Sequence, residues 1–81
     1  MIVRHYLVRN EGETARRFVI RLEEAEGRWT SSCEEVDSTG KVIPGSARIA
    51  PKFYGLTEEQ AARRMLAALE NSFDDVVETG L

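Results

Sequence analysis

The chain has 81 residues, which suits one domain spanning residues 1–81. Hydrophobic residues make up 42% and charged residues 31%, a balance that excludes an intrinsically disordered protein. The net charge of −3 argues against broad nucleic-acid affinity, because that affinity requires clustered positive charge.

Cellular location is indicated by the single cysteine, Cys33, which excludes an intrachain disulfide. Small secreted domains are usually rich in disulfides, so we expect a cytoplasmic location. Arg4 and Arg9 interrupt the N-terminal segment, which therefore does not resemble a signal peptide. No run approaches the roughly 20 apolar residues that span a bilayer, so we expect no membrane partner.

A first strand is predicted over residues 2–9, which are mostly β-branched or aromatic. Both sides of this strand carry apolar groups, so its orientation stays open. One side holds Val3, His5 and Leu7, and the other holds Ile2, Arg4, Tyr6 and Val8.

A hairpin is predicted from strands over residues 16–24 and 28–36, joined at Glu26-Gly27. A two-residue loop there places Ile20 opposite Cys33 and Leu22 opposite Ser31. One face then carries Phe18, Ile20, Leu22, Trp29, Ser31 and Cys33. The opposite face is mostly polar and is expected to be in contact with water.

Residues 41–50 are predicted to form either an edge strand that Pro44-Gly45 breaks or bulges, or a short strand after a loop. Residues 51–56 are expected to connect this strand to the helix. Phe53 and Tyr54 in this connection are expected to cover the end of the core.

The capping box Thr57-Glu58-Glu59-Gln60 predicts a helix over residues 58–77. Leu56 stands where a hydrophobic staple would place it. Apolar residues then recur every three or four positions: Ala62, Met65, Leu66, Leu69, Phe73 and Val76. The expected core combines the sheet and the helix: Phe18, Ile20, Leu22, Trp29, Ile49, Met65, Leu66, Leu69 and Phe73.

These elements predict an α+β fold with β-β-β-β-α order. An antiparallel sheet of three to four strands would pack one face against a single C-terminal amphipathic helix. The five arginines of residues 1–22 face only two carboxylates, whereas the remainder has six basic and twelve acidic residues. We interpret this asymmetry as pairing between the two parts within the sheet.

Catalytic, cofactor and metal sites are not expected, and neither is a small-molecule site. A zinc site requires about four Cys or His ligands, and the chain has only His5 and Cys33. A catalytic thiol would require these same two residues to meet, but a mid-strand cysteine is usually buried and unreactive. Glycine-rich phosphate loops are also absent from the sequence. We therefore expect a protein that is not an enzyme.

The leading hypothesis is a module for protein–protein interaction or self-association, for which a homodimer is one form. A free sheet edge, or the part of the first strand that the helix leaves uncovered, would supply the contact. The alternative is nucleic-acid binding through an arginine-bearing sheet face. The residues considered for this interaction surface are Arg4, Tyr6, Arg17 and Arg21. Against this alternative, Glu34 is placed to neutralise Arg17 across the strands.

Residues 54–61, Tyr-Gly-Leu-Thr-Glu-Glu-Gln-Ala, follow the predicted strands and enter the helix. This passage resembles the strand-to-helix passage of HicB-type antitoxins. Those proteins are small sheet-plus-helix domains that neutralise an RNase toxin. The resemblance covers about a quarter of the chain and consists mainly of the capping box. The sequence lacks a clear counterpart of that family's turn between its second and third strands. The resemblance implies a partner-binding role of the antitoxin kind.

Overall fold

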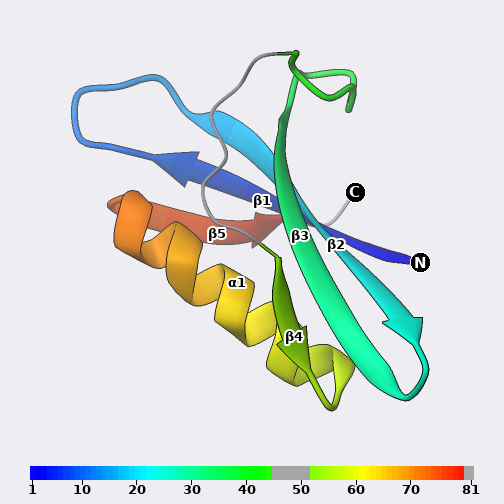
Figure 1. Cartoon of the computed structure of the whole chain (residues 1–81). Helices are drawn as coiled ribbons and strands as arrows, with labels where there is room; N and C mark the ends of the chain where they lie inside the picture. The colour runs from blue at the N-terminus through cyan, green and yellow to red at the C-terminus, as the bar shows by residue number, and fades with distance from the viewer. Residues whose placement is uncertain (45–51, 80–81) are drawn as a thin grey trace.

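A computed structural model describes residues 1–44 and 52–79 (Figure 1). Five antiparallel strands form one sheet in the order β4-β3-β2-β1-β5. The strands are β1 (Ile2–Arg9), β2 (Arg16–Ala25), β3 (Arg28–Val36), β4 (Phe53–Gly55) and β5 (Asp75–Thr79), and the helix is α1 (Glu58–Ser72). For the residues described, the α+β class and the single helix are confirmed. The sheet has five strands rather than three or four, and a strand follows the helix.

The β2–β3 hairpin has the predicted register. Ile20 lies opposite Cys33, and Leu22 lies opposite Ser31. Glu26 and Gly27 form the turn with φ angles of 55° and 76°, both in the left-handed region. Two positive φ angles match the twist of the flanking strands, which explains why this short loop sets the pairing.

The start of α1 confirms the predicted N-cap. The Thr57 hydroxyl accepts a hydrogen bond from the Gln60 backbone N–H at 3.1 Å. The Gln60 side chain accepts from the Leu56 N–H at 2.7 Å, one residue before the N–H that the capping box predicts. Leu56 is 78% exposed, so the prediction of a hydrophobic staple is wrong.

The helix ends at Ser72 and does not continue to residue 77. Phe73 is extended, and its N–H donates to the Leu69 carbonyl at 3.0 Å. Residues 75–79 instead form β5, which pairs with β1. The β-branched Val76 and Val77 favour a strand, and the acidic side chains around them oppose the helix dipole at this end.

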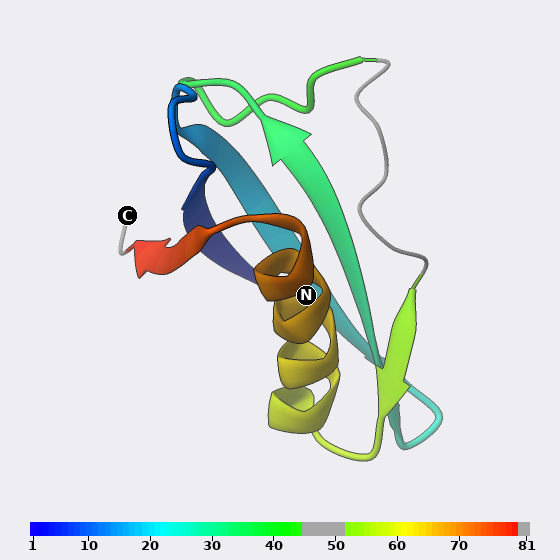
Figure 2. The same ribbon diagram turned by 90° about the vertical axis from the view of Figure 1, so that its left-hand side faces the viewer.

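The core lies between α1 and one face of the sheet (Figure 2), where the helix packs against β2, β3 and β4. Buried residues from both layers form one cluster: Tyr6, Val8, Phe18, Ile20, Leu22, Cys33, Ala61, Ala62, Met65, Leu69 and Phe73. Trp29 and Leu66 pack against this cluster but are only partly buried. Ile49, which the sequence analysis also assigned to the core, lies outside the described residues.

The segment between β3 and α1 differs from its prediction. Of residues 41–50, Val42 forms an isolated bridge with Val36, and positions 45–51 lie outside the described residues. Residues 53–55, predicted as a connection, pair with β3 as β4. Phe53 packs against the core cluster as expected, whereas Tyr54 is 47% exposed.

Candidate interaction surface

The predicted interaction surface consists of three arginines and one tyrosine, and these four residues are divided between the two faces of the sheet. Arg4 and Tyr6 pair with Ile20 and Phe18, so they share the helix-covered face. Arg17 and Arg21 lie on the other face, which we call the open face. The structure therefore brings Arg17 and Arg21 together and separates them from Arg4 and Tyr6.

Arg4 and Tyr6 are both engaged on the helix side. Arg4 donates to Glu58 at 2.7 Å and to Glu59 at 3.2 Å, which ties β1 to the first turn of α1. The hydrogen bond that Arg4 donates to Glu58 raises the pKa of Arg4, and Arg4 lowers the pKa of Glu59. Tyr6 is only 3% exposed, and burial raises its pKa. Neither residue presents a free group for a partner.

The centre of the open face is covered by the protein's own side chains. Val19 is 2% exposed although it points away from α1. Glu34 lies directly opposite Val19, and it forms an ion pair with Arg21. Glu34 therefore pairs with Arg21, not with Arg17 as the sequence predicted. Among the residues that the structure describes, Arg17 forms no ion pair.

Towards β5, the open face carries a less covered group that we call the β1–β5 patch: Val3, His5, Leu7, Val77 and Thr79. Leu7 faces Val77 and His5 faces Thr79 across the strand pair. Val77 is 58% exposed and Val3 is 40% exposed. The patch itself contains no carboxylate, lysine or arginine, and the Arg9–Asp75 ion pair borders it on the same face.

The two outer edges of the sheet differ in their protection. β4 is three residues long, and the Arg64 guanidinium donates to the Tyr54 carbonyl. On the open face, the Arg28 guanidinium stacks 4.7 Å from the centre of the Tyr54 ring. β5 is five residues long, and within residues 1–44 and 52–79 no strand pairs with its outer side. An unpaired edge presents backbone N–H and C=O groups to any strand that approaches.

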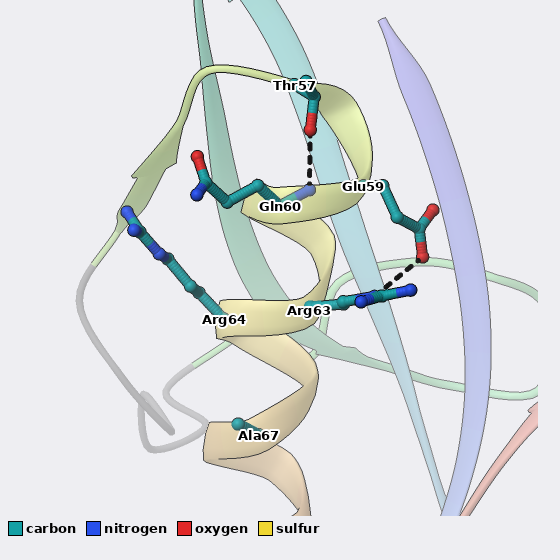
Figure 3. Close-up of a pocket in the computed structure, with 6 residues that line it drawn as sticks. All are labelled: Thr57, Glu59, Gln60, Arg63, Arg64 and Ala67. Carbon is teal, nitrogen blue, oxygen red and sulfur yellow. Dashed lines mark hydrogen bonds and ion pairs between the residues drawn. The ribbon is translucent and has the colours of Figure 1, made fainter.

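A shallow depression lies beside the first turns of α1 (Figure 3), lined by Thr57, Glu59, Gln60, Arg63, Arg64 and Ala67. Its polar groups already bind one another or nearby backbone. Arg63 lies 3.5 Å from Glu59, and Arg64 bonds the Tyr54 carbonyl. These contacts stabilise the helix start and the β4 edge, and they leave little unsatisfied polarity for a ligand.

A second depression is lined by Arg9, Glu11, Gly12, Glu13, Asp74 and Asp75. Here the β1–β2 turn is hydrogen-bonded to the segment that follows α1. The Glu11 N–H donates to Asp74 at 2.8 Å, and the Asp74 N–H donates to Asn10 at 3.0 Å. We interpret these bonds as the anchor that directs the chain from α1 into β5.

Cys33 and His5 lie on opposite faces of the sheet. Cys33 is on the helix side, 9% exposed, and burial raises its pKa to about 12. His5 faces Val19 on the open face. The sheet itself separates the two groups, so the Cys33–His5 pairing considered from the sequence does not form.

In the part of the chain that the structure describes, no group of three His, Cys, Asp or Glu side chains is arranged to hold a metal ion. Nor does α1, the helix found in that part, have the length and apolar character needed to cross a membrane.

Comparison with known proteins gave no relative: no family model, no curated protein and no solved structure matches this chain. The resemblance of residues 54–61 to HicB-type antitoxins therefore rests on that segment alone. In the structure this segment forms the end of β4 and the capped start of α1.

The sequence predicted contact at a free sheet edge or at the uncovered part of the first strand. β5 and Val77 were not predicted, because the predicted helix extended across them. The Val76-Val77 pair between acidic residues was the available signal, since adjacent β-branched residues favour strands.

Proposed function

We propose that this chain is a non-enzymatic protein-interaction domain that binds its partner through the β1–β5 patch and the adjoining β5 edge. The observation that carries the proposal is the position of Val77. Its side chain is 58% exposed on an edge strand, directly beside Leu7 on the face that α1 leaves uncovered.

Two kinds of interaction are available at this position. The β5 edge offers backbone hydrogen bonds to an added strand. The β1–β5 patch offers apolar area with few charges to desolvate. Such a surface favours a protein partner over a charged and strongly hydrated partner such as a nucleic acid. The remaining parts of the sheet are less suited, because α1, the Arg21–Glu34 pair and the Arg64 bond already cover them.

Nucleic-acid binding has less support from the same geometry. Arg4 binds Glu58 and Glu59 on the helix side, and Arg21 binds Glu34. Arg17 is then the one residue of the original set that remains exposed on the open face without an ion pair among the described residues. A single exposed arginine neutralises few phosphates, so it would release few counterions.

The test compares proteins retained by three tagged baits: the wild-type chain, Val3→Glu and Leu56→Glu. Both substitutions replace an exposed apolar residue with the same charge, but Leu56 lies before α1 and outside the β1–β5 patch. Matched melting temperatures would establish that all three are folded. We expect wild type and Leu56→Glu to retain the same partner, which includes an untagged copy of the chain, and Val3→Glu to lose it.

Equal retention by all three baits would contradict the proposal, because binding would then not involve the patch. Absence of any specific partner, including the untagged copy, would also contradict it. Salt-sensitive retention of RNA or DNA, lost in Arg17→Glu, would instead favour the nucleic-acid alternative.

A further inference from the structure

We infer that the partner at the β5 edge is a second copy of this chain, and that the two β5 strands pair antiparallel about a two-fold axis at Val77. This inference rests on the proposed function, because it assigns an occupant to the same edge. The result would be one continuous sheet in which each copy contributes all five of its strands.

The choice of edge follows from the unequal protection of β4 and β5. The Arg64 side chain of α1 already donates a hydrogen bond to the Tyr54 carbonyl of β4, and β4 is only three residues long. Short edges with bound backbone groups resist strand addition. β5 is longer, and among the described residues its outer side has no neighbour. The helix packs mainly on β2, β3 and β4, so it does not block an approach to β5 (Figure 2).

The register follows from the charges of β5, whose sequence is Asp-Val-Val-Glu-Thr. With Val77 opposite Val77 of the second copy, Asp75 lies opposite Thr79 and Val76 lies opposite Glu78. No carboxylate then directly faces another, and all five residues are paired. Opposing like charges destabilise a strand pair, so this arrangement is favoured.

Shifting the pairing by two residues in either direction brings carboxylates together. One shift places Glu78 opposite Glu78 of the second copy. The other places Asp74 opposite Glu78 and shortens the overlap. Shifts by a single residue are excluded in a continuous two-fold sheet, because directly opposed residues must point to the same face.

The same register joins the two β1–β5 patches. In each copy Val77 lies beside Leu7, and the two Val77 side chains meet at the axis. The joined open face would therefore carry an uninterrupted apolar row across the new contact. Stacking of two open faces is a poorer arrangement, because Arg17, Arg21 and Glu34 would all have to be desolvated.

Salt provides a first discriminating measurement. Each copy carries a net charge of −3, so the two copies repel each other at low ionic strength. Screening weakens this repulsion, and apolar and backbone contacts are not weakened by it. Light scattering of the full chain over a range of concentrations should show a dimer whose apparent affinity rises when sodium chloride is added.

Charge substitution at the axis tests the register itself. Val77→Lys and Val77→Glu each place two like charges opposite one another, so each should weaken dimerisation by about tenfold or more. A mixture of the two should regain the dimer, because lysine then faces glutamate. Leu56→Lys is the matched control, since it replaces another exposed apolar residue and should dimerise like wild type.

A cross-linking pair gives an independent geometric readout. Val77→Cys should form an intermolecular disulfide under mild oxidation, because directly opposed residues lie within bridging distance. Thr79→Cys should not, because each residue 79 faces residue 75. The native Cys33 is buried and does not compete.

A monomer at every concentration and salt level overturns the self-pairing. So does a dimer that tolerates Val77→Lys and does not cross-link through Val77→Cys. Neither result by itself overturns the wider proposed function, which fails if partner capture does not depend on Val3 or if the wild-type chain captures no specific partner. A dimer restored by mixing the lysine and glutamate variants supports the inference and fixes its register.

Discussion

At Gly55 the backbone of β4 passes close to the first turn of α1. A Cβ atom at this position would lie 2.7 Å from the Ala61 backbone nitrogen and 3.2 Å from the Ala61 Cα. Backbone atoms of a helix cannot move aside as a flexible side chain can. We expect Gly55→Ala to lower the free energy of unfolding by roughly 1–3 kcal/mol, measured by urea denaturation.

Gly12→Ala is the control for this prediction. Gly12 has a φ of 78°, but a Cβ there would meet nothing within 4 Å. Its substitution should therefore show only the cost of a left-handed backbone, about 1 kcal/mol. A loss at Gly55 no larger than the loss at Gly12 would argue against the close packing of β4 on α1.

Cys33 provides a second prediction for a single residue. Its thiol is 9% exposed, and burial raises its pKa to about 12. Because the thiolate is the reactive form, native protein near pH 8 should remain unmodified by a thiol-specific reagent. The same reagent should modify the protein fully in denaturant, as followed by mass spectrometry. Rapid labelling of the native protein would show that Cys33 is accessible.

The face on which each residue lies was predictable for some strands and not for others. The two-residue turn at Glu26-Gly27 set the pairing of its neighbours, so Ile20 and Cys33 were placed correctly. β1 has apolar residues on both sides, so its own pattern did not decide its orientation. Pairing of Tyr6 with Phe18 decides it, and such pairing depends on residues distant in sequence.

At the level of elements, one ion pair links β2 to β3 beside the end of α1. Arg16 donates to both oxygens of Glu35, at 2.9 and 2.8 Å. The same guanidinium lies 5.5 Å from the Phe18 ring centre and 5.3 Å from that of Phe73. A two-pronged carboxylate bond and two aromatic contacts together hold the hairpin against the residue that ends the helix.

This arrangement predicts how stability depends on acid. Arg16 lowers the pKa of Glu35 in the folded protein, relative to roughly 4.3 for an unfolded glutamate. The stabilisation is therefore fully present above the unfolded value and is lost as the pH falls through the folded value. At pH 7, Glu35→Gln should lower the free energy of unfolding by about 1 kcal/mol, a modest figure because Arg16 is partly exposed.

The difference between wild type and Glu35→Gln should disappear once the pH has fallen below the lowered pKa of folded Glu35, where both side chains are neutral. Denaturation curves over this pH range provide the measurement. Glu23→Gln serves as the control, because Glu23 is exposed and has no ion pair among the described residues. A constant difference at every pH would mean that Glu35 acts through its shape and not through its charge.

The end of α1 shows why an element boundary was missed. Apolar spacing of three and four residues continues through Phe73 and Val76, so the local pattern favours a longer helix. The competing interactions are the pairing with β1, the hydrogen bond from the Glu11 N–H to Asp74 and the hydrogen bond from the Asp74 N–H to Asn10. Those partners lie more than 60 positions away in sequence, and the spacing pattern contains no information about them.

For the whole molecule, the uneven charge of the sequence is resolved by internal pairing. Arg4, Arg9, Arg16 and Arg21 each form an ion pair with a carboxylate beyond residue 22. The interpretation that the two parts pair with each other within the sheet is confirmed for Arg9, Arg16 and Arg21, whereas Arg4 pairs with the helix. The β1–β5 patch was less predictable from the sequence, because its position depends on which strand forms the outer edge of the sheet beside β1.

The position of β1 between β2 and β5 has a consequence for folding during synthesis. The β2–β3 hairpin is local and can form once residue 36 has emerged from the ribosome. The outer side of β1 must wait for residues 75–79, which are translated last among the described residues. Until then a growing chain exposes the edge of β1, and non-local pairing of this kind is slow to form. On neighbouring ribosomes, nascent copies of this protein are therefore vulnerable to misassociation until residues 75–79 have emerged and paired with β1.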